Sequence, residues 1–128
     1  MPLVRVSVRK GRSPSEKRAL LDAVHAAIVE AFQVPDADRI QRLSEYPPEE
    51  FDIPTGHTER YTLVEITAFA GRSLSAKRDL YGAIVRNLSA LGIQPNDVLV
   101  VISEAPLENW GIRGAPATSA NLGFKVEV

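Results

Sequence analysis

The chain contains no cysteine, and this absence excludes disulfides, thiol nucleophiles and metal sites built on thiolates. The only two histidines, His25 and His57, lie far apart and do not form the spacing of a metal site. No run of apolar residues approaches the ~18 residues that cross a bilayer. Arg5, Arg9 and Lys10 interrupt the apolar core that a secretory signal would need. We therefore expect a cytoplasmic protein that uses no metal and no other cofactor.

The chain also has little net charge, because its 15 basic and 16 acidic residues leave a balance of −1. This balance gives no electrostatic reason to expect nucleic acid or an anionic membrane as a partner. Hydrophobic residues make up 45% and charged residues 24%, which is typical of a soluble globular protein. A length of 128 residues fits one domain, so we predict that residues 1–128 form a single domain.

The first part of the chain reads as strand, helix and strand. Valines alternate with polar residues over 3–10, which indicates a half-buried strand that ends at Gly11. Residues 13–16 (Ser-Pro-Ser-Glu) carry a capping serine, a proline for the first turn and the glutamate of a capping box. They predict a helix that runs to about Phe32, and a second strand follows at about 39–44.

The second part repeats this order after an interruption. Residues 45–60 are rich in Glu, Pro, Asp, Gly and Thr, and they predict an irregular connection or an excursion hairpin. A more apolar strand over 61–69 precedes a second helix at about 74–91. A fourth strand, a continuous apolar run at 98–103, is followed by a tail, 106–128, that contains the single tryptophan.

An internal repeat explains this organisation. The segment 11–20 matches 71–80 at an offset of 60, and seven of the ten pairs are identical. Each pseudo-repeat, about 2–46 and 61–105, is therefore a βαβ unit with parallel strands and a right-handed crossover. We predict an α+β fold in which a four-stranded sheet carries two helices on one face. The other face of the sheet needs cover, which favours an oligomer.

Pro2 has no equivalent in the second repeat, because only the first repeat can begin with a free amine. If an aminopeptidase removes Met1, the nitrogen of Pro2 becomes a secondary amine at the chain terminus. An α-amino group titrates near pH ~8, within the range that a pocket can tune for acid or base chemistry. The repeat-related position is near Thr62, which lies inside the chain and has no free amine. The sequence therefore indicates one amine site per subunit.

These features resemble a known family. Pro2, a short strand and a Gly11-Arg12-Ser13 triplet that opens a helix are similar to the tautomerase superfamily. Residues 20–32 and 34–39 resemble its malonate semialdehyde decarboxylase-like branch. The resemblance covers nearly the whole chain, and it implies a homotrimer of two-repeat subunits that acts on a small-molecule carboxylate.

The resemblance also implies roles for individual residues. Pro2 would be the catalytic amine, and Asp38 the carboxylate near its nitrogen. Arg72, from the second repeat, would bind the carboxylate of the substrate. Trp110 and Ile112 fall where the branch has apolar residues of the pocket. Decarboxylases and dehalogenases of the superfamily carry another arginine just before the one matching Arg72, whereas this chain reads Phe-Ala-Gly there.

Three functions stay open at this point. In a tautomerase, a neutral Pro2 moves a proton in a 2-oxo or enol carboxylic acid. In a decarboxylase or hydratase of a 3-oxo acid, a cationic Pro2 polarises the carbonyl. The anion of Asp38 favours this second function, because it raises the pKa of a nearby amine, and the missing second arginine argues against it. The third possibility is a non-catalytic trimeric binding protein, which retention of Met1 would favour.

Each candidate also has a plain structural interpretation. Asp38 precedes a strand, as does its counterpart Asp97, so both fit the role of a turn residue. Arg72 fits a solvated surface charge, and Trp110 fits packing of the tail. We expect His25, at the border of the apolar face of the first helix, to be packed rather than catalytic. We likewise expect a structural role for Arg12, the repeat partner of Arg72.

Overall fold

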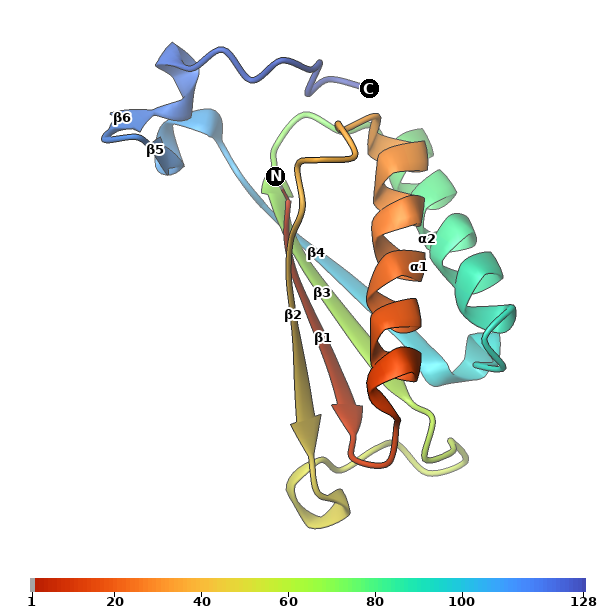
Figure 1. Cartoon of the computed structure of the whole chain (residues 1–128). Coiled ribbons are helices and arrows are strands. Elements are labelled where there is room, and N and C mark those ends of the chain that lie inside the picture. The colour runs from red at the N-terminus through yellow and green to blue at the C-terminus, as the bar shows by residue number, and fades with distance from the viewer. Residues whose placement is uncertain (1) are drawn as a thin grey trace.

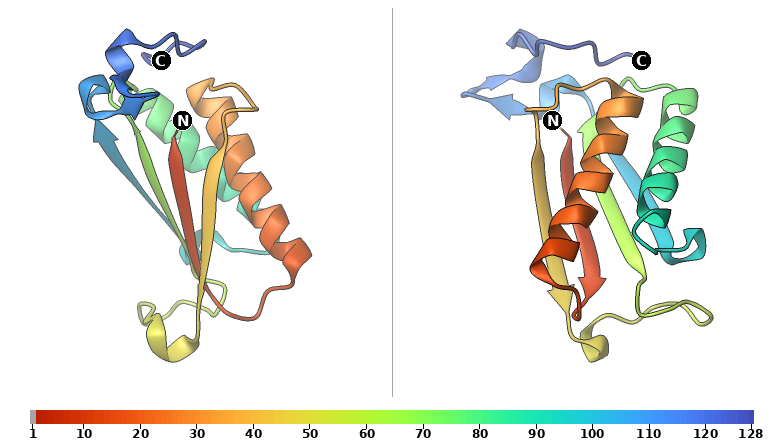
Figure 2. Two further views of the ribbon diagram at one scale, coloured as in Figure 1. Left: turned by 60° about the vertical axis from the view of Figure 1, so that its left-hand side comes forward. Right: turned by 45° about the vertical axis from the view of Figure 1, so that its right-hand side comes forward.

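The computed structural model describes residues 2–128. Met1 lies outside the described residues, and so does the question of its removal. The main elements are β1 (Leu3–Arg9), α1 (Pro14–Phe32), β2 (Ile40–Tyr46), β3 (Thr62–Phe69), α2 (Leu74–Ser89) and β4 (Val98–Ala105). The sheet has the order β2-β1-β3-β4. Strands pair in parallel within each repeat, and the repeats join where β1 runs antiparallel to β3. Both helices cover one face (Figures 1 and 2), as predicted.

The two helices begin in the same way because the repeat supplies the same cap. Ser13 accepts a hydrogen bond from the backbone N–H of Glu16, and the side chain of Glu16 accepts one from the N–H of Ser13. Ser73 caps α2 through the N–H of Ala76. The second helix ends at Ser89, two residues before the predicted end at Leu91, and a turn completes the segment.

The core lies between the helices and the sheet. Even-numbered residues of β1 and β3 point toward the helices, and they are buried together with the apolar stripe of each helix. The largest members are Phe32, Leu20, Ile28, Ile66, Leu80, Ile84 and Leu88. On the opposite face of the sheet, large side chains stay exposed in the single chain, namely Leu3, Ile40, Leu99 and Val101.

The connection between the repeats is irregular rather than a hairpin. It contains a short 3₁₀ helix at Pro48–Glu50, and no strand pairing is recorded for residues 47–61. Asp97 anchors it, because the carboxylate accepts hydrogen bonds from the N–H and the hydroxyl of Thr58. The buried Asp97 therefore has the structural role expected of a turn residue.

The tail differs from the sequence prediction. It forms a small hairpin, β5 (Gly111–Ile112) and β6 (Ala115–Pro116), which the sequence analysis missed. The alternating run at 124–128 forms no strand. The tail crosses the end of the sheet near the N-terminus (Figure 2). Within residues 2–128, no helix is long and apolar enough to cross a membrane.

Candidate active site

Pro2 lies at the end of the sheet where several chain segments converge. It is buried and directly precedes β1. Leu3, the next residue, is opposite Ile40 of β2 and Thr67 of β3. The register therefore brings the start of β2 and the end of β3 to either side of Pro2. Figure 1 shows the N-terminus at the same end as the α1–β2 connection, the β3–α2 connection and the tail.

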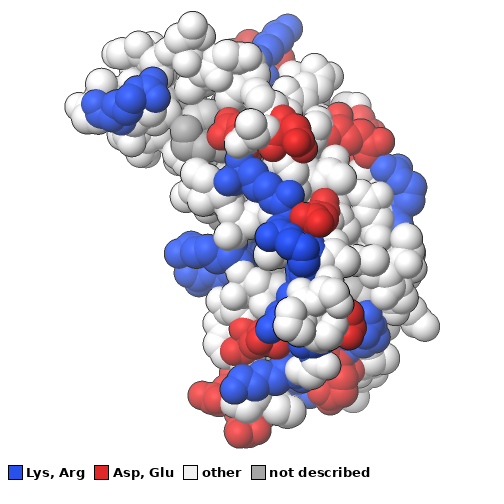
Figure 3. All heavy atoms as spheres, viewed as in Figure 1, with Lys and Arg blue, Asp and Glu red and all other residues white. Residues whose placement is uncertain are grey.

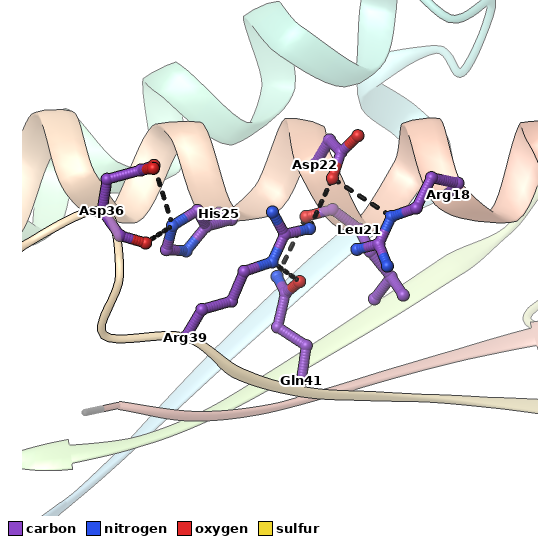
Figure 4. Close-up of polar contacts among 7 residues, drawn as sticks. All are labelled: Arg18, Leu21, Asp22, His25, Asp36, Arg39 and Gln41. Atoms are coloured by element: carbon purple, nitrogen blue, oxygen red, sulfur yellow. Dashed lines mark hydrogen bonds and ion pairs between the residues drawn. The ribbon is translucent and has the colours of Figure 1, made fainter.

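Asp38 lies in the α1–β2 connection at this end. Its backbone N–H donates to the carbonyl of Pro35 at 3.0 Å, which forms the turn that the sequence indicated. His25 fastens the same connection, because its Nε2 lies 2.8 Å from the carbonyl oxygen of Asp36 and 3.2 Å from its Oδ1 (Figure 4). The buried His25 thus packs against the loop that carries Asp38, in agreement with a structural role for the histidine.

The start of β2 is held against α1 by a second polar group. Arg39 donates to the carboxylate of Asp22 and to Gln41, and Arg18 approaches Asp22 from the neighbouring turn of the helix (Figure 4). The hydrogen bond from Arg39, aided by the charges of both arginines, lowers the pKa of Asp22. Gln41 also donates to the carbonyl of Leu21. These contacts hold the residues that follow Asp38 in the chain, Arg39 and Gln41, against α1.

Arg72 lies in the β3–α2 connection and is 6% exposed. Its Nη1 donates to the carbonyl of Phe69 at 3.0 Å, and its guanidinium lies 4.9 Å from the ring centre of Phe32. Both Nε and Nη2 are buried and have no hydrogen-bond partner among residues 2–128. Burial lowers the pKa of Arg72, although the charge of Glu104 opposes this shift. Arg72 is thus not the solvated surface charge of the plain interpretation.

Aromatic side chains cluster around Phe69, the residue whose carbonyl accepts the hydrogen bond from Arg72. Phe69 is fully buried, with Trp110 packed edge-on at 4.6 Å and Phe124 stacked at 6.4 Å between ring centres. The indole N–H of Trp110 donates to the carbonyl of Ala105. The last residues of the tail pass over the β3–α2 connection, where the carbonyl of Val128 accepts a hydrogen bond from Ser73.

A pocket of about 320 Å³ opens between the α1–β2 connection and the tail. Asp38 and Ile112 both line it, so the structure brings these two predicted residues together. Phe124 forms part of its wall and separates it from Phe69. Pro2, Arg72 and Trp110 are not among its described lining residues, although they lie at the same end of the sheet.

Arg113 is a pocket residue that the sequence analysis missed. It lies at the tip of the β5–β6 hairpin and lines the same pocket as Asp38. Arg113 and Gly114 both have positive φ, 52° and 83°, as a two-residue type I′ turn requires. Gly114, which adopts positive φ without strain, was therefore a sequence signal of this turn. It went unnoticed because the flanking strands are only two residues long.

The face drawn in Figure 3 has no large patch of one charge. Basic and acidic side chains are interspersed across it, as the near-zero net charge suggests. Among residues 2–128 no group of three or more His, Asp and Glu side chains is arranged to hold a metal ion. The ionisable side chains placed at this end of the sheet include the carboxylate of Asp38 and the guanidinium groups of Arg72 and Arg113.

Comparison with known proteins identifies the family. Two family models, each described as "Tautomerase enzyme", match residues 38–113 and residues 2–55. The chain belongs to the tautomerase family. Members of this family are isomerases, and the enzyme class predicted from the sequence is confirmed.

Individual relatives of this tautomerase agree with the assignment. A probable tautomerase of Bacillus subtilis (strain 168), YrdN, is 32% identical over 116 residues, covering 86% of this chain and 89% of the relative. The crystal structure of a malonate semialdehyde decarboxylase is 32% identical, with a TM-score of 0.79 and coverage of 84% and 88%. A fused 4-OT described as a symmetric trimer is 32% identical, with a TM-score of 0.80 and coverage of 91% and 97%.

Proposed function

We propose that this tautomerase interconverts the keto and enol forms of small 2-oxo carboxylic acids, with the amine of Pro2 as the proton carrier. The neutral amine removes a proton from the enol oxygen, or from the carbon next to the carbonyl, and returns it to the other position. Arg72 holds the carboxylate of the substrate, and Ile112 and Trp110 supply apolar walls. Aminopeptidase removal of Met1 is part of this proposal, because an amide nitrogen cannot act as a base.

The free edge of Arg72 is the observation that carries the proposal. With Nη1 bonded to Phe69, the guanidinium keeps Nε and Nη2, the two N–H donors that point in parallel. Such an edge matches the two oxygens of one carboxylate in a bidentate pair. Two unpartnered donors on a buried cation are costly unless a ligand satisfies them. A carboxylate bound there would lie at the end of the sheet where Pro2 begins the chain.

We also propose that the subunits assemble as a homotrimer through the uncovered face of the sheet. Leu3, Ile40, Leu99 and Val101 are exposed on that face, with exposed fractions of 36–46%. The related fused 4-OT is described as a trimer, which supports this assembly. Burial of these side chains would supply the cover that the single chain lacks.

Decarboxylation or hydration of a 3-oxo acid is the second candidate function. Two observations favour it, namely the similarity to malonate semialdehyde decarboxylase and the position of Asp38 in a pocket at the Pro2 end. An anion near the amine stabilises its cationic form, and that form polarises a carbonyl instead of abstracting a proton. The residue before Gly71 is alanine, so the chain lacks the second arginine expected of such members.

The pH dependence of kcat/KM separates the two functions. With the enol of a 2-oxo acid as substrate, we expect an activity that rises as an amine of pKa near or below neutrality loses its proton. Pro2→Ala is expected to lower kcat/KM by roughly 10²–10⁴-fold, the usual contribution of a positioned acid or base. Intact-mass measurement confirms beforehand that the sample begins at Pro2.

The base mechanism would be rejected if the pH profile of kcat/KM showed that activity requires a protonated group with a pKa well above neutrality. Turnover of a 3-oxo acid in the same preparation would then establish the decarboxylase. Unchanged rates for Pro2→Ala with both substrate classes would reject both catalytic functions. A binding protein would still bind the substrate in that case.

A further inference from the structure

The internal repeat creates a second arginine site at the opposite end of the sheet. Arg12 lies between β1 and α1, just as Arg72 lies between β3 and α2. Its Nη2 donates to the carbonyl of Arg60 at 3.1 Å, two residues before the start of β3. Thr62 begins β3 where Pro2 precedes β1 in the first repeat. This end therefore reproduces the arginine framework of the candidate active site but has no free amine.

A small cavity lies beside these two arginines. It has a volume of about 80 Å³, and Arg12, Arg60 and Glu16 form its polar wall. Its apolar wall comes from Ala19, Leu20, Leu91 and Ile93. The volume is far below the roughly 300–1,000 Å³ of pockets that take drug-sized ligands, so only a small ion with a short apolar part fits.

The hydrogen bonding of this cavity is incomplete. Arg60 donates through Nη2 to the carbonyl of Leu91, but its Nε is buried and has no partner among residues 2–128. Oε2 of Glu16 lies 4.0 Å from Nη1 of Arg60, and Oε1 of Glu16 accepts the capping hydrogen bond from the N–H of Ser13. Burial and then the charge of Arg60 lower the pKa of Arg12, whereas the charges of Glu16 and Glu45 oppose this shift. Glu45 is paired with Lys17. Arg12, Arg60 and Lys17 against Glu16 and Glu45 leave one positive charge, which suits a monoanion.

We propose that this cavity is a non-catalytic binding site for a short monocarboxylate. The carboxylate accepts hydrogen bonds from Nε of Arg60 and from the guanidinium of Arg12, and its alkyl part packs against Leu91 and Ile93. The ligand bridges the start of α1 and the first residues of the α2–β4 connection. Because Thr62 supplies no amine, the bound acid is not converted. This site is separate from Pro2 and does not depend on the proposed reaction.

The test follows the arginine side chains directly. Propionate is added to the full chain, and the Nε–Hε signal of Arg60 is recorded by ¹H–¹⁵N correlation NMR. We expect a saturable shift of this signal, while propionamide, the uncharged analogue, causes none. Arg12→Gln is expected to weaken propionate binding about tenfold or more, since one charged hydrogen bond is lost. Arg18→Gln removes the same charge from the exposed face of α1 and is expected to bind as the wild type does.

Further variants separate this site from the candidate active site. Arg72→Lys and Pro2→Ala are expected to keep the Arg60 shift and its affinity, whatever happens to turnover. If Arg12→Gln does not fold, Arg60→Lys replaces it, because lysine keeps the charge and loses the Nε donor, and propionate binding to this variant is followed by the Nε–Hε signal of Arg12. A silent Arg60 signal at high propionate, an equal shift with propionamide, or unchanged affinity in Arg12→Gln or Arg60→Lys would overturn the proposal.

Discussion

Replacement of Arg72 by lysine tests how this tautomerase holds a substrate carboxylate. Lysine retains the positive charge but presents a single ammonium group in place of the parallel Nε and Nη2 donors. A hydrogen bond to a charged group contributes about 1.5–3 kcal/mol. Loss of one such bond from the transition state therefore lowers kcat/KM roughly 10- to 100-fold, at about 1.36 kcal/mol for each factor of ten.

The same substitution also has a structural effect, which the experiment must separate. Nη1 of Arg72 donates to Phe69, and the guanidinium lies over the ring of Phe32. Their loss is expected to destabilise the fold by about 1–2 kcal/mol. Activity is therefore measured well below the melting temperature of the variant, by the ultraviolet absorbance change during ketonisation of an enol substrate.

The repeat supplies a matched control in Arg12→Lys. Arg12 follows the same glycine, precedes the same capping serine and is half-buried, but it lies at the end of the sheet away from Pro2. We expect kcat/KM of Arg12→Lys to stay within about twofold of the wild type. A value for Arg72→Lys within twofold of the wild type, or an equal loss in Arg12→Lys, would refute a carboxylate bound at the free edge of Arg72.

Two further predictions concern the loops that frame the sheet. Burial of Asp97 favours its protonated form, but the hydrogen bonds from Thr58 outweigh this effect and lower its pKa below the ordinary value. The ionised carboxylate therefore adds stability above pH ~3.9 that is lost as pH falls through the folded-state pKa. Asp97→Asn should cost about 1–3 kcal/mol in urea unfolding at pH 7 and much less near pH 3, and an equal cost at both would contradict the assignment. A Cβ on Gly71 would lie 3.3 Å from the tail, whereas one on Gly11 would meet nothing within 4 Å, and both have φ near 130°. Gly71→Ala should therefore speed amide hydrogen exchange at Ser73, Gly11→Ala should not, and equal rates would exclude the tail contact.

The sequence predicted the βαβ framework because local signals and the repeat agreed. The segment 13–16 fixed the start of α1, and the match of 11–20 with 71–80 transferred that start to α2. Alternation in β1 gave its buried face correctly, because one side of the sheet packs on helices and the other does not. The boundaries of β2 and β4 were short by about two residues, since strand ends depend on the pairing partner.

The candidate site was only partly predictable, because its surroundings come from distant segments. The role of Arg72 was predicted from the family resemblance, but nothing local shows that its guanidinium is buried with two N–H donors that have no partner among residues 2–128. The position of Arg113 in the pocket depends on a two-residue turn and on the way the hairpin folds back. The short run at 124–128 alternates apolar and polar residues but forms no strand. It instead places Phe124 against Phe69, a contact that only the tertiary fold provides.

The two ends of the sheet now explain how duplication yields one catalytic centre in the proposed function. Both ends carry an arginine from the same Gly-Arg-Ser triplet, so both attract a carboxylate. At one end, Arg72 is buried with its guanidinium against the ring of Phe32, and burial strengthens its interaction with a bound anion. At the other end, Arg12 and Arg60 line the cavity. The chain continues through Arg60 into Thr62, so this end has no terminal amine. Anion binding is thus expected at both ends, whereas proton transfer requires the single terminal amine.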